Sequence, residues 1–149
     1  MNYENPCDKP VVLCVDDDKV LLDITKTALE FAGYEVLTAT DGHAALEVFT
    51  SQTVDAVVLD FEMPGMDGGE VAREMKRRNP RIPKLMFSGC TSIPSDASAA
   101  IEAFCSKPAD LRMLLSRVKS LITKFRTAGS SRDLSHAHFA KRLQHSCSL

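Results

Sequence analysis

Short apolar runs alternate with amphipathic stretches along most of this chain of 149 residues, and this alternation constrains the fold more than any other feature. The run Val11–Val15 is uninterrupted and rich in valine, which is typical of a strand covered on both faces. The stretch 19–32 carries apolar residues three and four positions apart, behind a capping Asp18 and before Gly33, which predicts a helix. The positions expected to face the core are Leu21, Ile24, Ala28 and Phe31. The chain therefore begins with a strand followed by a helix.

This strand-then-helix unit recurs four more times. Further strands are expected at residues 34–39, 56–59, 84–87 and 103–106, and further helices from Asp41 onward and at 67–78, 95–102 and 110–125. The segment 95–102 is rich in alanine and serine. Strands that alternate with helices in this way form a parallel, doubly wound α/β sheet with helices on both faces. In such a sheet, ligands bind at the carboxyl ends of the strands, where the strand order reverses.

Length, charge and cysteine content bound the organisation of the chain. One domain is expected at 10–125, with an N-terminal extension at 1–9 and a flexible or loosely docked tail at 126–149, in which 127–131 resembles a flexible link. The formal charge of -2 gives no reason to expect binding to nucleic acid or to an anionic membrane. No apolar run has the length of a membrane span, and the interpretation is a cytoplasmic protein. Five cysteines without a closely spaced pair indicate neither a disulfide framework nor a zinc site.

Polar side chains follow four of the predicted strands at the point where each strand ends. They are Asp16 and Asp17, Asp60, Ser88 and Lys107. Because the carboxyl ends of parallel strands meet at one edge of a sheet, we expect these side chains to lie together. Two like charges about 4 Å apart repel by about 4 kcal/mol at an effective dielectric constant near 20, so a cluster of three carboxylates calls for a cation. Hard oxygen ligands favour Mg²⁺ or Mn²⁺, and phosphoryl chemistry is the natural use of such a site.

Four motifs carry a resemblance to a known family. They are Val15-Asp16-Asp17-Asp18, the run Leu59-Asp60-Phe61-Glu62-Met63-Pro64-Gly65-Met66-Asp67-Gly68, Phe87-Ser88-Gly89, and Lys107-Pro108. Over residues 10–125 the chain resembles the receiver domain of two-component response regulators. The resemblance implies a flavodoxin-like receiver fold with five parallel strands in the order 2-1-3-4-5. It also implies a stand-alone phosphoacceptor switch, phosphorylated by a sensor histidine kinase or a histidine phosphotransferase of a two-component system or phosphorelay.

The resemblance assigns roles to the residues at the strand ends. Asp60 resembles the nucleophile that attacks the phosphorus of a phosphohistidine. Lys107 is expected to pair with one phosphoryl oxygen, and Ser88 to bind another and pull its loop inward. The metal ligands implied are Asp16, Asp17, Asp60 and the backbone carbonyl of Glu62.

Residues around this site acquire roles in the same way. Phe104 resembles the aromatic switch residue that turns inward when the loop after the fourth strand moves. Glu62 and Cys90 stand where the family tunes the access of hydrolytic water, and hence the lifetime of the acyl phosphate. Val20 and Leu22 are expected at a rim of the first helix that contacts the phosphodonor protein. The downstream protein and the formation of a homodimer on phosphorylation are left open.

Two other functions share features with the phosphoacceptor switch. The first is a receiver-like binding module that works without phosphorylation, against which the intact Asp60 and Lys107 count. The second is a phosphatase of the haloacid dehalogenase type, which also uses a nucleophilic Asp near Mg²⁺. Its nucleophile follows the first strand and pairs with an Asp two residues on, whereas here the candidate follows the third strand and Glu62 stands in that place. Enzymatic turnover is therefore not expected beyond transfer of the phosphoryl group to Asp60 and its later hydrolysis.

Overall fold

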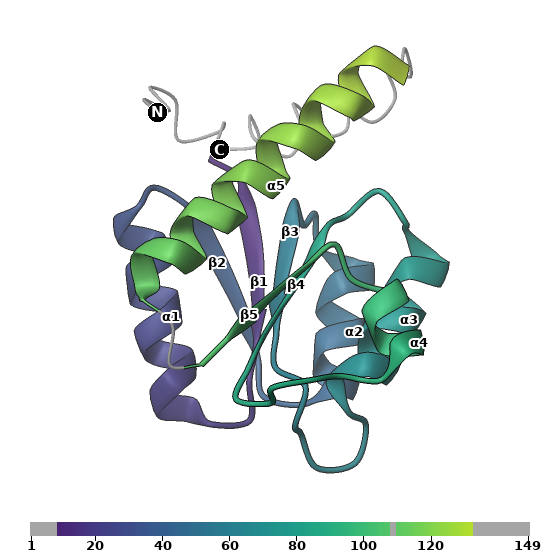
Figure 1. The fold of residues 1–149 in the computed structure, drawn as a ribbon. Helices are drawn as coiled ribbons and strands as arrows, with labels where there is room; N and C mark the ends of the chain where they lie inside the picture. The colour runs from purple at the N-terminus through teal and green to yellow at the C-terminus, as the bar shows by residue number, and fades with distance from the viewer. Residues whose placement is uncertain (1–8, 108–109, 133–149) are drawn as a thin grey trace.

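A central parallel sheet has helices on both faces in the computed structural model, which describes residues 9–107 and 110–132 (Figure 1). The strands are β1 (Val11–Val15), β2 (Glu35–Ala39), β3 (Ala56–Leu59), β4 (Lys84–Ser88) and β5 (Ala103–Ser106). The helices are α1 (Lys19–Phe31), α2 (Gly42–Ser51), α3 (Gly68–Arg78), α4 (Ser95–Ala99) and α5 (Leu111–Arg132). All strand pairs are parallel and the order is β2-β1-β3-β4-β5, which confirms the predicted fold class. The order reverses between β1 and β3, so the functional edge is expected there.

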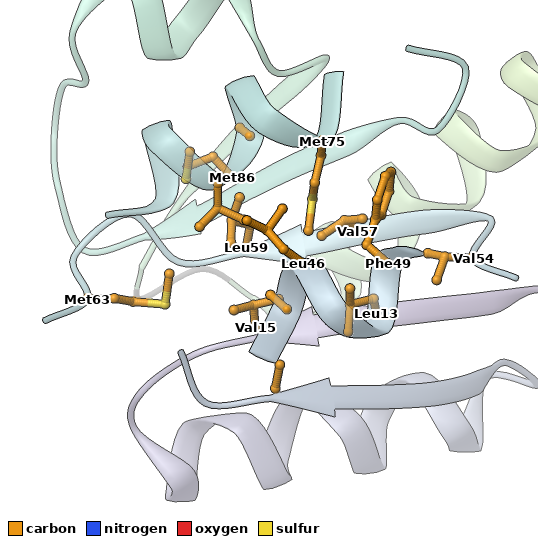
Figure 2. Packing of buried hydrophobic residues seen from close by; sticks show 14 of the residues in the cluster. Leu13, Val15, Leu46, Phe49, Val54, Val57, Leu59, Met63, Met75 and Met86 are labelled. Atoms are coloured by element: carbon orange, nitrogen blue, oxygen red, sulfur yellow. The ribbon is translucent and has the colours of Figure 1, made fainter. Parts of the chain in front are cut away.

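Two apolar clusters hold the layers together, one on each face of the sheet. On the face covered by α2 and α3, Leu46, Phe49 and Met75 pack against Val57 and Leu13 (Figure 2). On the opposite face, α1 and α5 pack against the sheet through the buried residues Leu22, Leu29, Leu114, Val118, Leu121 and Ile122. Every residue of β3 is buried, which explains why this strand is a continuous apolar run without alternation.

The predicted buried face of α1 was wrong. The helix buries Leu22, Thr25 and Leu29, whereas Ile24 is 47% exposed and Phe31 is 96% exposed. The pattern favoured the stripe with more apolar residues, but the stripe that meets the sheet contains a threonine. Leu22 is consequently a core residue and cannot lie on a docking surface, which corrects the role expected for it.

Helices α4 and α5 differ in length from the prediction. Helix α4 ends at Ala99 after a single short turn, and it is held to α3 by an ion pair between Arg73 and Asp96 at 2.8 Å. Helix α5 continues through Arg132, so the expected link at 127–131 is helical. Apolar spacing predicts only the part of a helix that packs on a core, and that part ends near Phe125. The remainder of the expected tail and most of the N-terminal extension lie outside the described residues.

Among the described helices, none combines the length and the apolar character needed to cross a bilayer.

Candidate functional site

Three carboxylates meet at the carboxyl ends of β1 and β3. Asp16, Asp17 and Asp60 each offer an oxygen atom within 4.8 Å of the others. The register of the sheet sets this arrangement, because Val15 pairs with Leu59 and the Asp60 amide donates to the Val15 carbonyl at 2.9 Å. Asp16 and Asp60 are each 8% exposed, whereas Asp17 is exposed. The expected acidic cluster is therefore present, with one ligand open to solvent.

Lys107 reaches the same cluster from the end of β5. Its Nζ atom lies 2.7 Å from Asp16 Oδ2 and 3.9 Å from Asp60 Oδ1. Its backbone amide donates to the Ser88 carbonyl at 2.8 Å, so pairing with the preceding strand fixes where the side chain starts. The ammonium also lies 5.3 Å from the centre of the Phe87 ring, within range of a cation–π interaction. Sequence reasoning missed this role of Phe87, although its position next to Ser88 at a strand end was an available signal.

Burial governs the electrostatics of Asp60. Desolvation raises the pKa of its carboxyl above the ordinary value of 3.8, and the nearby Lys107 ammonium opposes that rise. A positive charge placed among the three carboxylates would favour the ionised form further. The cluster therefore combines a buried carboxylate with a negative charge that the single Lys107 ammonium does not fully balance.

Ser88 is the fourth expected site residue, at the end of β4 next to the strand that carries Asp60. It is 1% exposed, and its hydroxyl has no hydrogen-bond partner within residues 9–107 and 110–132. A buried hydroxyl without a partner is costly, typically about 1–3 kcal/mol. The position suits a hydroxyl that would donate a hydrogen bond to an additional oxygen in the site.

The loop after Asp60 is held against the start of α3. Gly65 has φ +79°, which suits the tight turn in this loop. Asp67 caps α3 and forms a reciprocal capping box with Glu70. The Gly68 amide donates to the Phe61 carbonyl at 2.8 Å, and there is no space for a side chain at Gly68. The backbone around Asp60 is therefore closely packed.

Two further expected residues contact each other across the site. The Cys90 thiol donates to Glu62 Oε1 at 2.8 Å, which joins the loop after β3 to the loop after β4. This hydrogen bond raises the pKa of the Cys90 thiol.

Phe104 is half-buried and packs against the cluster on the α2 and α3 face, opposite Met86 in register. Val20 is 68% exposed at the start of α1, as expected for a surface residue.

The donor set is compatible with a hard divalent cation. Asp16, Asp17 and Asp60 supply only carboxylate oxygens, and no histidine belongs to this group among the described residues. Such ligands suit Mg²⁺ or Mn²⁺, which keep several waters and are bound through one or two carboxylates.

The comparison with known proteins agrees with the fold. The response regulator receiver domain family matches residues 12–119. The chain belongs to this family. It is 36% identical to the response regulator MprA of Mycolicibacterium vanbaalenii over 117 residues, covering 76% of this chain and 50% of that protein. The response regulator MprA of Mycobacterium leprae is 35% identical over 117 residues, with 76% of this chain and 51% of that protein covered. The receiver chain thus spans about half the length of these curated relatives.

Solved receiver structures have the same fold. A response regulator receiver domain protein from Methanospirillum hungatei matches with a TM-score of 0.77 and 29% identity, over 82% of this chain and 100% of that one. The response regulator protein TrrA from Thermotoga maritima, solved in complex with Mg²⁺-BeF, matches with a TM-score of 0.72 and 34% identity, over 75% of this chain and 98% of that one. The receiver fold of this chain is thereby established.

Proposed function

We propose that this receiver domain is a phosphoacceptor switch in which Asp60 takes a phosphoryl group from a histidine kinase or a histidine phosphotransferase. The observation that carries the proposal is the convergence of Asp60 with Asp16, Asp17 and Lys107, whose charged atoms lie within hydrogen-bonding or metal-ligating range. These groups come from three different strands, and they meet at the edge where such sheets bind ligands.

The chemistry follows from the positions of the side chains. An Asp60 oxygen attacks the phosphorus of a phosphohistidine, a P–O bond forms, the P–N bond breaks, and the imidazole of the donor leaves with the electron pair. Asp16, Asp17, Asp60 and the Glu62 carbonyl would hold Mg²⁺ or Mn²⁺, which neutralises charge on the transferring group. Lys107 moves from its contact with Asp16 to pair with a phosphoryl oxygen. The Mg²⁺-BeF complex of the TrrA relative supports the cation, since that protein is similar over most of this chain.

Ser88 and Phe104 form the switch in this proposal. The Ser88 hydroxyl is buried and without a partner among the described groups, so an acyl phosphate on Asp60 would supply its acceptor. Ser88 then draws the start of the β4–α4 loop inward, and Phe104, which is half-buried on the neighbouring strand, follows into the space released. The altered surface around β5 is the signal to a downstream protein.

Glu62 and Cys90 set the lifetime of the acyl phosphate. Their hydrogen bond spans the two loops that begin at Asp60 and Ser88, so both groups stand where hydrolytic water would enter. We expect Glu62→Asn to change the decay rate of the acyl phosphate several-fold. Phosphate release from the purified phosphoprotein measures the rate, and decay curves that overlay those of the parent would rule out this role.

The phosphodonor docks on α1 beside the acidic cluster. Val20 lies two residues after the capping Asp18 and is mostly exposed, and Leu21 and Ile24 are partly exposed on the same helix. An apolar rim of this kind suits a helical bundle that presents a phosphohistidine. Formation of a homodimer after phosphorylation is a separate outcome that size-exclusion chromatography with light scattering measures.

The deciding experiment is chemical phosphorylation. The protein is incubated with phosphoramidate and Mg²⁺ and its intact mass is followed, with Asp60→Asn as the control. The gain of one phosphoryl group in the parent and none in the variant is expected. A parent that is never labelled would indicate a binding module that works without phosphorylation, and sustained turnover of unrelated phosphoesters would indicate a phosphatase.

A further inference from the structure

Thr25 is a polar residue on the buried face of α1. Thr25 lies between Leu22 and Leu29 on the face that packs against the sheet, and it is 7% exposed. Its hydroxyl makes no hydrogen bond to any group in the described part of the chain. By contrast, the hydroxyls of Thr50 and Thr127 each donate to the carbonyl four residues earlier, at 2.8 Å. Thr25 therefore lacks the contact that usually satisfies a threonine within a helix.

Thr25 lines a small cavity that reaches the acidic cluster. The cavity has a volume of about 10 Å³, and Asp16 and Asp60 line it as well. Most of the remaining wall consists of apolar side chains from β1, β3 and β4. About 10–15 Å³ is the space that one bound water needs, and such a water requires two to four polar partners. The three polar residues supply that number.

We propose that this cavity binds one water molecule that joins Thr25 to the carboxylates of Asp16 and Asp60, and that Thr25 thereby positions both carboxylates for cation binding. The Thr25 hydroxyl donates to the water oxygen, and the two water hydrogens are then free to donate to the two carboxylates. Lys107 does not line the cavity, so the water acts separately from the ammonium that contacts Asp16. This inference rests on the proposed function, because it concerns the same acidic site.

The test compares two substitutions at one position. Thr25→Val keeps the shape of the side chain and removes the hydroxyl, whereas Thr25→Ser keeps the hydroxyl. Isothermal titration calorimetry with Mg²⁺ is expected to show an affinity about tenfold weaker for Thr25→Val, which is the lower end of the effect that loss of a group orienting metal ligands commonly has. Thr25→Ser should remain within about twofold of the parent. Thr50→Val is the control, because Thr50 lies in α2 and does not line the cavity, and its hydroxyl donates to the Leu46 carbonyl and accepts from Arg78.

A second readout does not depend on metal. High-resolution crystal structures of the metal-free parent and of Thr25→Val are expected to show a water within hydrogen-bond distance of Thr25 Oγ1 in the parent and none at that place in the variant. A parent cavity that holds no water would overturn the inference. So would Mg²⁺ affinities that agree between the parent and Thr25→Val, while the parent still binds Mg²⁺ and accepts a phosphoryl group. A parent that does neither would overturn the proposed function itself, and the inference with it.

Discussion

Substitution of Gly68 by alanine tests how tightly the Asp60 loop is held against α3. A Cβ atom at Gly68 would overlap the Asp60 carbonyl oxygen, and it would lie 2.8 Å from Phe61 Cα and 2.9 Å from the Asp60 carbonyl carbon. These neighbours are backbone atoms and cannot rotate away. The start of α3 must therefore move away from the loop, which strains or breaks the hydrogen bond from the Gly68 amide to the Phe61 carbonyl.

The magnitude follows from the two effects of this displacement. Overpacking costs about 1–3 kcal/mol and a lost hydrogen bond about 1 kcal/mol, while the reduced entropy of the unfolded chain returns up to about 1 kcal/mol. A net loss of about 2–3 kcal/mol is expected, which lowers the melting temperature by roughly 8–12 °C for a domain of this size. Since the atoms that the added Cβ would overlap belong to Asp60 and its neighbour Phe61, the strain also shifts the backbone that carries the Asp60 carboxylate, and the rate of phosphorylation by phosphoramidate should fall about tenfold or more.

Circular dichroism measures the melting temperature, and intact mass after timed incubation measures phosphorylation. Gly89→Ala is the matched control, because a Cβ at Gly89 would meet no atom within 4 Å. It should stay within about 2 °C of the parent, since a substitution in open space is usually worth less than about 0.5 kcal/mol. A Gly68→Ala protein that melts with the parent and takes up phosphate at the parent rate would refute the close packing inferred around Asp60.

Three further predictions concern the docking rim, a buried ion pair and the titration of Asp60. Val20→Arg should slow phosphotransfer from a donor protein about tenfold without changing the rate with phosphoramidate, and equal rates with the donor would contradict docking at this rim. Lys84 is completely buried, and its ammonium lies 3.5 Å from Glu102 Oε2. Glu102→Ala should lower the free energy of unfolding in urea by about 3 kcal/mol and Lys84→Met by less than about 1 kcal/mol, because only the first leaves a buried ammonium without its ion-pair partner. Equal losses would contradict that reasoning. Burial raises the folded pKa of Asp60 above 3.8, so its contribution to stability is present below that pH and is lost as pH rises through the folded pKa. In metal-free buffer Asp60→Asn should therefore melt above the parent at pH 7, with a difference that shrinks toward pH 4, and a lower melting temperature at pH 7 would refute this sign.

The site was predictable from the sequence because its residues stand at strand ends. Asp16, Asp60, Ser88 and Lys107 each follow a short apolar run, and the parallel topology brings the ends of such runs to one edge. The spacing of apolar residues and the lengths of the apolar runs were sufficient to place the five strands, whereas the strand order, which is confirmed, came from the family resemblance. No knowledge of side-chain packing was required, since the sheet itself carries these residues to their positions.

The lysine at the start of β4 illustrates what spacing alone does not reveal. Lys84 is completely buried, its Nζ atom donates to the Ile82 carbonyl at 3.0 Å, and it lies 3.5 Å from Glu102 Oε2. The pKa of Lys84 is lowered by this burial, although Glu102 opposes the shift. The pairing depends on the register of β4 against β5, and the run Lys84–Ser88 contains no signal for that register.

The misplaced face of α1 and the unexpected contact between Glu62 and Cys90 have a related cause. Both depend on which residue of one helix or loop contacts another helix, strand or loop. The spacing of apolar residues along the sequence does not contain that information, because it records only how apolar each residue is. Thr25 counts against burial in such a pattern, yet it is among the buried residues that adjoin the acidic cluster. A polar residue on the core face of a helix is acceptable where another polar group lies within reach, so the residue that misled the prediction of the core is also the one that points toward the site.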